Sequence, residues 1–338
     1  MRFPSIGQLL LSMLCLTFSA AAEAGRPASP EAWLFPPATA ADSKLGDDRL
    51  LRELFAKPEQ WTSARSKLHV LGLADWQLAR LDDRELQDWL HKIKTWKLKL
   101  ALETSVLSNS AADAKSALPA IEKAIARLEK LGGRLDYLVL AATCDNAQNL
   151  HKDQTFAVEE CTALLADLHR CHPDLLVGDC ETYPGGGLDL AAWLCAVQAK
   201  AKEKKTRGLD FLQIQVDGYA LLFSAERAKY SWPKVKQIED AARAKHVLFG
   251  LRYAPTNVAH LARKYNPNDL AWYIGLMRQG YDYFYVHGNP DQFVIACWDS
   301  APARAVPETE DGTLTRAVDD FCSTFYRLGG VPIWVKSK

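Results

Sequence analysis

Two carboxylates stand one residue apart near the middle of the chain. Asp179 and Glu181 follow the apolar run DLLV at 174–177 and precede Tyr183, a proline and three glycines. Alternate residues of a strand face the same way, so the two side chains share one face of a predicted strand. Neighbouring carboxylates raise each other's pKa, and one of them can then stay protonated near neutral pH. The pair therefore predicts acid–base chemistry where this strand ends.

Short apolar runs alternate with amphipathic stretches from Lys67 onward. Strands are predicted at 69–74, 98–103, 135–143, 174–181, 209–217, 246–254, 281–287 and 293–299. Eight strands alternating with helices over roughly 250 residues are typical of an α/β fold of the (β/α)8, or TIM, barrel type. Only GNPDQ separates the last two predicted strands, so one irregular unit is expected to lack the seventh helix. An open doubly wound sheet is the alternative, but no glycine-rich turn follows the first strand.

The carboxyl ends of the strands, with the loops after them, form the site in such a barrel. Polar and aromatic residues stand where the predicted strands end, and the candidate binding residues are Trp76, Glu103, Gln213, Gln215, Asp217, Arg252, Tyr253, His287 and Trp298. Along 212–217 the polar residues alternate with apolar ones, so the polar set is expected to point into the barrel mouth. Acids, amides and aromatics together suit a polyhydroxylated ligand.

Single members of this set also have structural explanations. A lone acid at a strand end, such as Glu103, is often a helix N-cap or an ion-pair partner. His287 precedes Gly-Asn-Pro, where a histidine with a structural hydrogen bond is equally expected. Trp298 fits core packing as well as stacking on a sugar. The Asp179 and Glu181 pair is the stronger functional candidate because two acids share one face.

The sequence around the pair resembles the fourth-strand D-x-x-D-x-D-x-E signature of chitinase-like glycoside hydrolases. Asp174, Asp179 and Glu181 match it, whereas Val177 replaces the middle aspartate. The resemblance implies that Glu181 is the general acid. It also implies that Asp179 is its partner and orients the N-acetyl group of the substrate.

Two shorter stretches resemble the same family. LRYA at 251–254 resembles its sixth-strand M-x-Y-D motif and keeps Tyr253, with Ala254 in place of the aspartate. Trp298 stands where the family's last strand carries a tryptophan at the floor of the site. The resemblance implies a secreted glycoside hydrolase-like enzyme that acts on a polysaccharide or oligosaccharide. The alternative is a carbohydrate-binding barrel that has lost hydrolytic activity, as Val177 and Ala254 allow.

A metal-dependent sugar isomerase or hydrolase is a third possibility. Its ligands would come from Glu103, Asp179, Asp217 and His287. Only one histidine stands at a predicted strand end, and catalytic metal sites of this kind use more nitrogen ligands. No metal and no other cofactor is therefore expected.

Residues 1–24 predict a secretory signal peptide, with a basic start, an apolar run from Leu9 to Phe18, and small residues at Ala22 and Ala24. Cleavage near Ala24 would leave a secreted or periplasmic protein. No other stretch is long and apolar enough to span a bilayer. An irregular lead-in with a short helix is expected at 25–66, and the barrel domain at 67–338.

The charge balance bears on possible partners. Forty-one basic and 41 acidic residues cancel, without the basic excess typical of nucleic-acid or anionic-membrane binding. A carbohydrate is thus the expected partner, with neither nucleic acid nor membrane. None of the cysteines has a zinc-ligand spacing, and Cys161 and Cys171 are a candidate local disulfide.

Overall fold

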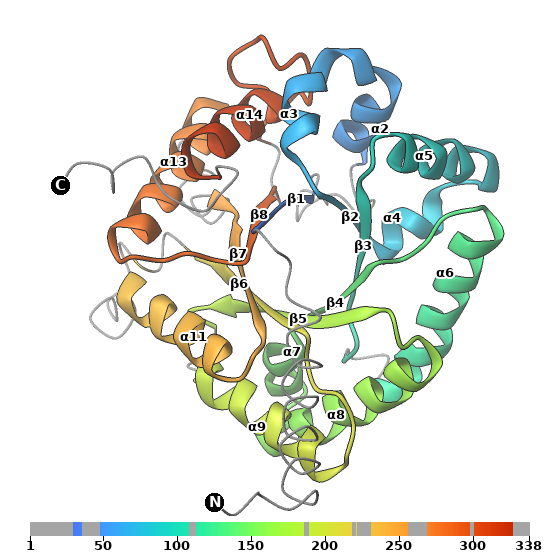
Figure 1. Ribbon diagram of the computed structural model, residues 1–338, viewed down its shortest axis with the longest axis vertical. Helices are drawn as coiled ribbons and strands as arrows, with labels where there is room; N and C mark the ends of the chain where they lie inside the picture. The colour runs from blue at the N-terminus through green and yellow to red at the C-terminus, as the bar shows by residue number, and fades with distance from the viewer. Residues whose placement is uncertain are drawn as a thin grey trace, which may run out of the picture.

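Eight parallel strands close into a single barrel. The computed structural model describes residues 30–35, 48–107, 113–185, 189–217, 221, 231–255, 269–297 and 301–326. Each strand pairs with the next, and the first pairs with the last to complete the ring (Figure 1). The strands are β1 Glu31–Phe35, β2 Val70–Ala74, β3 Lys99–Thr104, β4 Tyr137–Ala141, β5 Leu176–Tyr183, β6 Phe211–Val216, β7 Leu248–Tyr253 and β8 Gln292–Ala296.

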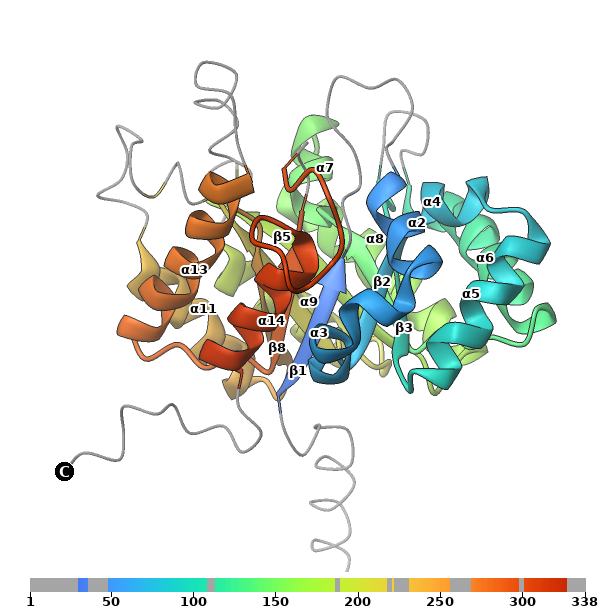
Figure 2. The same cartoon turned by 90° about the horizontal axis from the view of Figure 1, so that it is seen from above.

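At least one helix follows every strand and covers the outside of the barrel (Figures 1 and 2). These helices are α2 Arg49–Ala56, α3 Thr62–Lys67, α4 Asp75–Arg80, α5 Asp83–Thr95, α6 Leu118–Lys130, α7 Thr143–Asn149, α8 Gln154–Cys171, α9 Leu190–Glu203, α11 Trp232–Ala244, α13 Asp269–Tyr285 and α14 Leu314–Phe325. Short 3-10 turns lie at Pro58–Trp61 and Ala114–Ala117. The predicted (β/α)8 fold is confirmed.

Local capping explains where several helices begin. Asp82, Asp153, Asp189 and Thr313 precede α5, α8, α9 and α14, and each side chain accepts the backbone N–H of the residue three positions later. Such caps satisfy N–H groups that have no acceptor inside the helix. The chain therefore leaves the barrel and turns into its outer helices at positions that the sequence specifies locally.

The prediction that 281–287 forms a strand is wrong. These residues include the last turns of α13, and the seventh helix that was expected to be missing is present. The alternating tyrosines of YDYFYVH imitate a strand pattern. In the structure, Trp272, Leu276 and Tyr283 form one buried helical face, because positions four and eleven apart lie close together around a helix.

The expected irregular lead-in also needs correction. Residues 31–35 form β1, all five are buried, and they pair with β8 along their whole length and with β2 at two positions. The barrel therefore begins at Glu31, not at residue 67, and only the short helix expected in this region is confirmed as α2. With β1 counted, the strand that carries Asp179 and Glu181 is the fifth, whereas the chitinase-like signature belongs to a fourth strand.

The barrel interior is filled by side chains. Trp33 packs against Tyr137 and Phe211, with ring centroids 4.5 and 5.9 Å away. A Cβ atom on Gly178 would lie 2.2 Å from the Phe211 ring, so glycine is required for this approach. At the amino ends of the strands, Glu31 contacts Lys99 at 2.6 Å. A second apolar layer lies between the sheet and the helices.

The candidate disulfide between Cys161 and Cys171 is not formed. Cys161 and Cys171 lie ten residues apart on α8, which separates them by about 15 Å at the rise of a helix, and a disulfide needs Cα atoms within about 7 Å. No disulfide joins the cysteines of the described residues. Within the same residues, no helix is long and apolar enough to cross a membrane. The predicted signal peptide at 1–24 lies outside the described residues.

Candidate functional site

The side chains of Asp179 and Glu181 point away from the barrel mouth. On the adjacent strand β6, Asp179 is in register with Leu212 and Glu181 with Ile214. Residues in register on neighbouring parallel strands face the same side of the sheet, and both apolar partners belong to the layer beneath the helices. Asp179 and Glu181 are themselves fully buried. The expectation that this pair opens into the mouth is wrong.

Both acids are held by groups of the outer helices. The Thr143 hydroxyl donates to Asp179 Oδ1 at 2.7 Å, and the indole N–H of Trp193 on α9 donates to Oδ2 at 3.1 Å. Glu181 accepts the backbone N–H of Cys144 at 2.6 Å and that of Asp145 at 3.3 Å. The pair therefore fastens the first turn of α7 to β5.

The pair is placed to hold a shared proton. Burial raises the pKa of Glu181 well above its usual range, and the charge of Asp179 raises it further. Burial also raises the pKa of Asp179, against hydrogen bonds from Glu181, Thr143 and Trp193 that favour its ionised form. Both shifts favour the protonated form of a carboxyl in this pair, more strongly for Glu181. The pair lies on the face of β5 that points away from the mouth.

A sequence signal for this orientation was present. Val177 and Tyr183 share the face of the two acids, and both are buried in the apolar layer under the helices. The opposite face carries Gly178 and Cys180, small residues that suit a crowded barrel interior. The prediction that the two acids share one face is confirmed, whereas the prediction that this face points inward is wrong.

One cluster of inward-facing polar side chains joins Glu103 and Arg252, near the carboxyl ends of β3 and β7, to Gln213 and Gln292 deeper in the barrel. Arg252 Nη1 lies 2.6 Å from Glu103 Oε2, and Arg252 Nη2 donates to Gln213 Oε1 at 3.0 Å. Gln213 Nε2 in turn donates to Gln292 Oε1 at 2.9 Å. The Arg252 guanidinium also lies over the Phe35 ring, with 4.6 Å between its carbon and the ring centroid. Three predicted site residues, Glu103, Gln213 and Arg252, are thus brought together.

Burial separates the floor of the mouth from the groups nearer solvent. Arg252 and Gln213 are completely buried, Glu103 is buried with 11% of its side chain exposed, and Gln215 is half-buried. Gln215 is in register with Arg252, so it faces the same interior. Glu103 and Gln215 are therefore the predicted residues best placed to meet a ligand that enters at this end.

Asp145 is a rim residue outside the predicted site set. It lies in the first turn of α7, and its half-buried carboxylate accepts a hydrogen bond from the backbone of Thr182. Burial raises the pKa of this carboxyl. A Cβ atom on Gly185 would lie 2.7 Å from its oxygens, so the strand end passes close by. Its position shortly after the end of β4 was the sequence feature that could have identified Asp145 as a rim residue.

Two further predicted residues lie at the same end of the barrel. Asp217 follows β6, and its backbone N–H donates to the carbonyl of Tyr183 at 2.7 Å. Trp76 lies in α4, directly after β2, with the Arg80 guanidinium 4.8 Å from its ring centroid. Both are half-buried and are available to line the approach to the mouth.

The structure does not bring Tyr253 and His287 to the mouth. Tyr253 faces outward and packs against Phe321 of α14, with ring centroids 4.7 Å apart, because it alternates with the inward-facing Arg252. His287 lies exposed in the turn between α13 and β8, at the amino ends of the strands. His287 was predicted at the mouth because 281–287 was predicted to be a strand, and that prediction is wrong. Trp298 lies outside the described residues.

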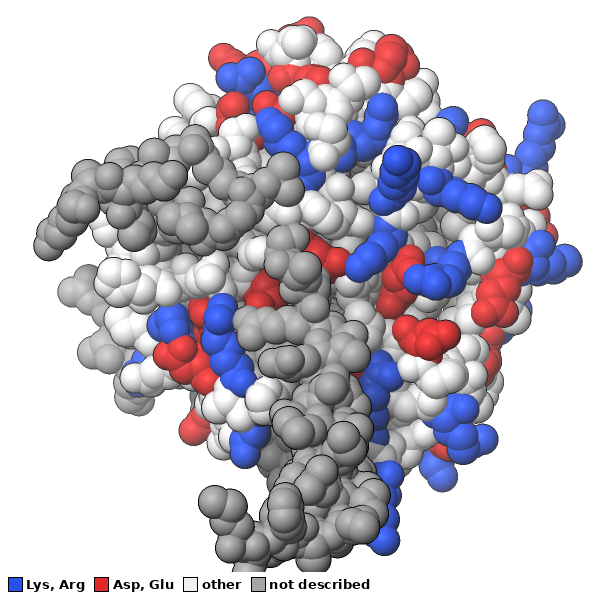
Figure 3. All heavy atoms as spheres, in the orientation of Figure 1, with Lys and Arg blue, Asp and Glu red and all other residues white. Residues whose placement is uncertain are grey.

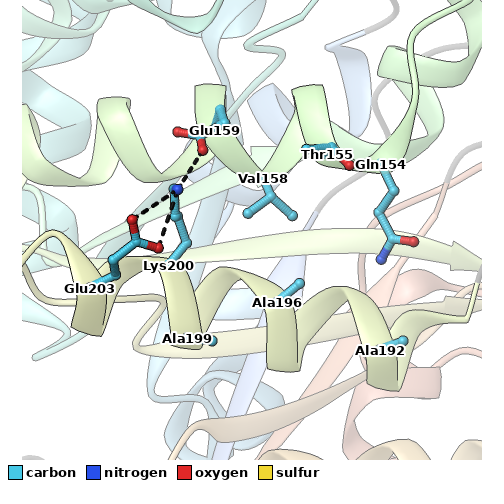
Figure 4. Close-up of a pocket in the computed structure, with 9 residues that line it drawn as sticks. All are labelled: Gln154, Thr155, Val158, Glu159, Ala192, Ala196, Ala199, Lys200 and Glu203. Atoms are coloured by element: carbon cyan, nitrogen blue, oxygen red, sulfur yellow. Dashed lines mark hydrogen bonds and ion pairs between the residues drawn. The ribbon is translucent and has the colours of Figure 1, made fainter.

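No group of three or more potential metal-ligating side chains occurs in the described part of the chain. A groove of about 500 Å³ lies elsewhere, on the outer surface between α8 and α9, where Lys200 bridges Glu159 and Glu203 (Figure 4). Acidic and basic side chains are interspersed over the face seen in Figure 3. The mouth remains the candidate site because it alone collects the predicted polar residues.

No family model and no curated protein matches the chain. Among solved structures, a glucosidase from Croceicoccus marinus is similar over 89% of this chain and 68% of its own, with 13% identity and a TM-score of 0.52. A psychrophilic endo-β-1,4-xylanase of glycoside hydrolase family 10 is similar over 86% and 96%, with 8% identity and a TM-score of 0.48. At 13% identity the similarity to the glucosidase shows the fold alone, a (β/α)8 barrel.

Proposed function

We propose that this chain binds a carbohydrate at the mouth of the barrel and does not use Glu181 as a general acid. The observation that carries the proposal is the orientation of β5. Its two acids lie beneath helices, while Glu103, Gln215 and Arg252 face the mouth. This is the non-catalytic alternative that the sequence already allowed.

The chemistry of the mouth supports a polyhydroxylated ligand. Sugar hydroxyls both donate and accept hydrogen bonds, and the carboxylate of Glu103 and the amide of Gln215 offer matching groups. Arg252 holds Glu103 at 2.6 Å, which fixes the acceptor before a ligand arrives. The proposal includes export to a secreted or periplasmic location, supported by the predicted signal peptide at 1–24.

Titration calorimetry with neutral oligosaccharides tests the proposal. Xylo-, cello- and chito-oligosaccharides are titrated into the wild-type chain and into Glu103→Gln, with reducing ends assayed in parallel. We expect binding without turnover, weakened about tenfold in Glu103→Gln, which corresponds to the loss of one charged hydrogen bond. His287→Ala is the matched control, because His287 is exposed at the opposite end and should leave affinity unchanged.

Two outcomes would overturn this function. One is an unchanged affinity in Glu103→Gln together with a loss in His287→Ala, which would move the site to the other end of the barrel. The other is hydrolysis by the wild type that disappears in Glu181→Gln while α7 stays folded, which would restore the acid role implied by the chitinase-like resemblance.

Hydrolysis through Asp145 is a second candidate function. The specific observation is that burial raises the pKa of this rim carboxyl, as a proton donor to a glycosidic oxygen requires. In this case the wild type would release reducing ends and Asp145→Asn would lose at least about a hundredfold in rate, the usual scale of general acid catalysis. Turnover that persists in Asp145→Asn would exclude it.

A further inference from the structure

The buried acids of β5 have no role in the proposed binding, yet they contact the helix that carries Asp145. We propose that the Asp179–Glu181 pair anchors α7 and so positions Asp145 at the rim of the mouth, and that removal of the shared proton releases this anchor. Asp179 and Glu181 are then positioning residues. The effect on ligand binding depends on the proposed function, whereas the anchoring itself does not.

Helix α7 depends on its contacts with β5. It has only seven residues, too few to be stable as an isolated helix in water. Its N-cap residue Ala142 makes no side-chain cap and has a left-handed backbone, with φ of 53°. The backbone N–H groups of Cys144 and Asp145 find their acceptors in the carboxyl of Glu181. The hydrogen bonds of the first turn of α7 are thus completed by a side chain of β5.

Both acids are fully buried on one face of β5, and each accepts two hydrogen bonds from the helices around them. Asp179 receives the Thr143 hydroxyl and the Trp193 indole, while Glu181 receives the two backbone N–H groups of α7. With one proton shared, the carboxyls attract each other and a single negative charge faces the positive end of the helix. Without that proton, two carboxylates repel each other inside the apolar layer.

No positively charged group among the described neighbours of the pair would stabilise a second negative charge on it. From α7 the titratable neighbours are Cys144 and Asp145, from α8 Cys161, and from β5 itself Cys180. These groups are neutral or negative. Helix α9 contributes the uncharged indole of Trp193, and β6 contributes Leu212 and Ile214. When both acids are ionised, the repulsion between them is therefore relieved by separation of α7 from β5.

Asp145 connects this anchor to the mouth. Its backbone N–H donates to Glu181, and its carboxylate accepts the backbone N–H of Thr182 on the same strand. Figure 2 shows α7 at the end of the barrel toward which the strands point. Displacement of the first turn of α7 would consequently move a carboxylate at the rim.

Hydrogen–deuterium exchange of the full chain tests the anchor without any ligand. Pulse labelling between pH 6 and 9, corrected for intrinsic exchange rates, follows a peptide that contains residues 143–149. In the wild type, protection of this peptide should fall with rising pH by up to about tenfold per pH unit, the linkage of one proton. In Glu181→Gln, which cannot ionise and keeps one of the two oxygens that accept α7 N–H groups, this pH dependence should vanish.

Glu239→Gln is the matched control. Glu239 is another buried acid, on α11, where it accepts the Tyr283 hydroxyl and the backbone N–H of Asn289. This variant should keep the wild-type pH dependence in α7. If Glu181→Gln does not fold, Thr143→Ala replaces it and should lower α7 protection already at pH 6, since Asp179 loses one donor. Protection of α7 that is independent of pH in the wild type, or unaltered by Glu181→Gln and by Thr143→Ala, would overturn the proposal.

Oligosaccharide titration over the same pH range separates the two proposals. If the anchor also positions the rim, affinity should fall in parallel with α7 protection in the wild type but stay level in Glu181→Gln. A pH-dependent α7 in a chain that binds no oligosaccharide would leave the anchor standing and refute the proposed function. Binding with a pH-independent α7 would do the reverse.

Discussion

The carboxyl of Glu181 combines complete burial with two backbone hydrogen-bond donors from α7. Burial penalises its charged form, and the adjacent Asp179 adds repulsion. From the sequence alone, a carboxyl with a raised pKa is easily taken for a catalytic acid. Its surroundings instead give it a structural role, because it accepts two backbone N–H groups of α7.

At this scale we predict a specific pH dependence of stability. The pKa of Glu181 is raised above its usual 4.5, so the folded chain keeps a proton that the unfolded chain loses as pH rises. The free energy of unfolding should therefore fall above about pH 4.5, by up to about 1.4 kcal/mol per pH unit. Urea denaturation at pH 5, 6 and 7 should show a shallower decline in Glu181→Gln; equal slopes in both proteins would contradict this.

The segments of this chain differ in how far their local sequence determines whether they form a helix or a strand. The helices α5, α8, α9 and α14 begin at side-chain caps that are visible in the sequence. In contrast, the alternating tyrosines at the end of α13 suggest a strand, and the helix is chosen because Trp272, Leu276 and Tyr283 pack together against the barrel. Tertiary packing decides such ambiguous segments.

The junction between β4 and α7 gives a prediction at the scale of the element. Ala142 adopts a left-handed backbone with φ of 53°, which costs a residue with a Cβ atom roughly 1 kcal/mol or more. We expect Ala142→Gly to raise the free energy of unfolding by roughly 1 kcal/mol, because glycine takes this conformation without that clash. Chemical denaturation measures the change, and destabilisation by the substitution would show that Ala142 is not strained.

The whole molecule depends on a strand of only five residues. β1 joins β2 to β8, and its Trp33 fills the interior between Tyr137 and Phe211. Without it, the barrel would expose two strand edges and lose a central side chain. Closure at β1 is therefore a condition for the geometry of the mouth.

A pair of truncations tests this dependence. A chain that begins at Lys67 lacks β1, α2 and most of α3, so we expect it to lose cooperative thermal unfolding followed by circular dichroism. A chain that begins at Pro30 keeps every strand and serves as the control, with a melting curve close to that of the full chain. Cooperative unfolding of the shorter chain would show that β1 is dispensable.

Much of the fold was accessible from the sequence because β/α alternation is a local, repeated pattern. Residues such as Val70, Leu138 and Phe249 stand in apolar runs that were recognised as strands. Of the predicted binding residues, Glu103, Gln213 and Arg252 contact one another inside the barrel and Gln215 faces the same interior. Their role in binding stays a prediction. β1 was missed because its five residues stand between prolines, and its strand character depends on pairing with β8 at the far end of the chain.

The sequence by itself determined that Asp179 and Glu181 share one face of a strand, since alternation has a period of two residues. It did not determine which face. That choice was made by the register of β5 against β6, where Leu212 and Ile214 must pack under the helices, and by closure of the ring through β1. The small residues Gly178 and Cys180 favour the inward face only weakly. The assembled barrel therefore decides whether the two acids meet solvent or a helix.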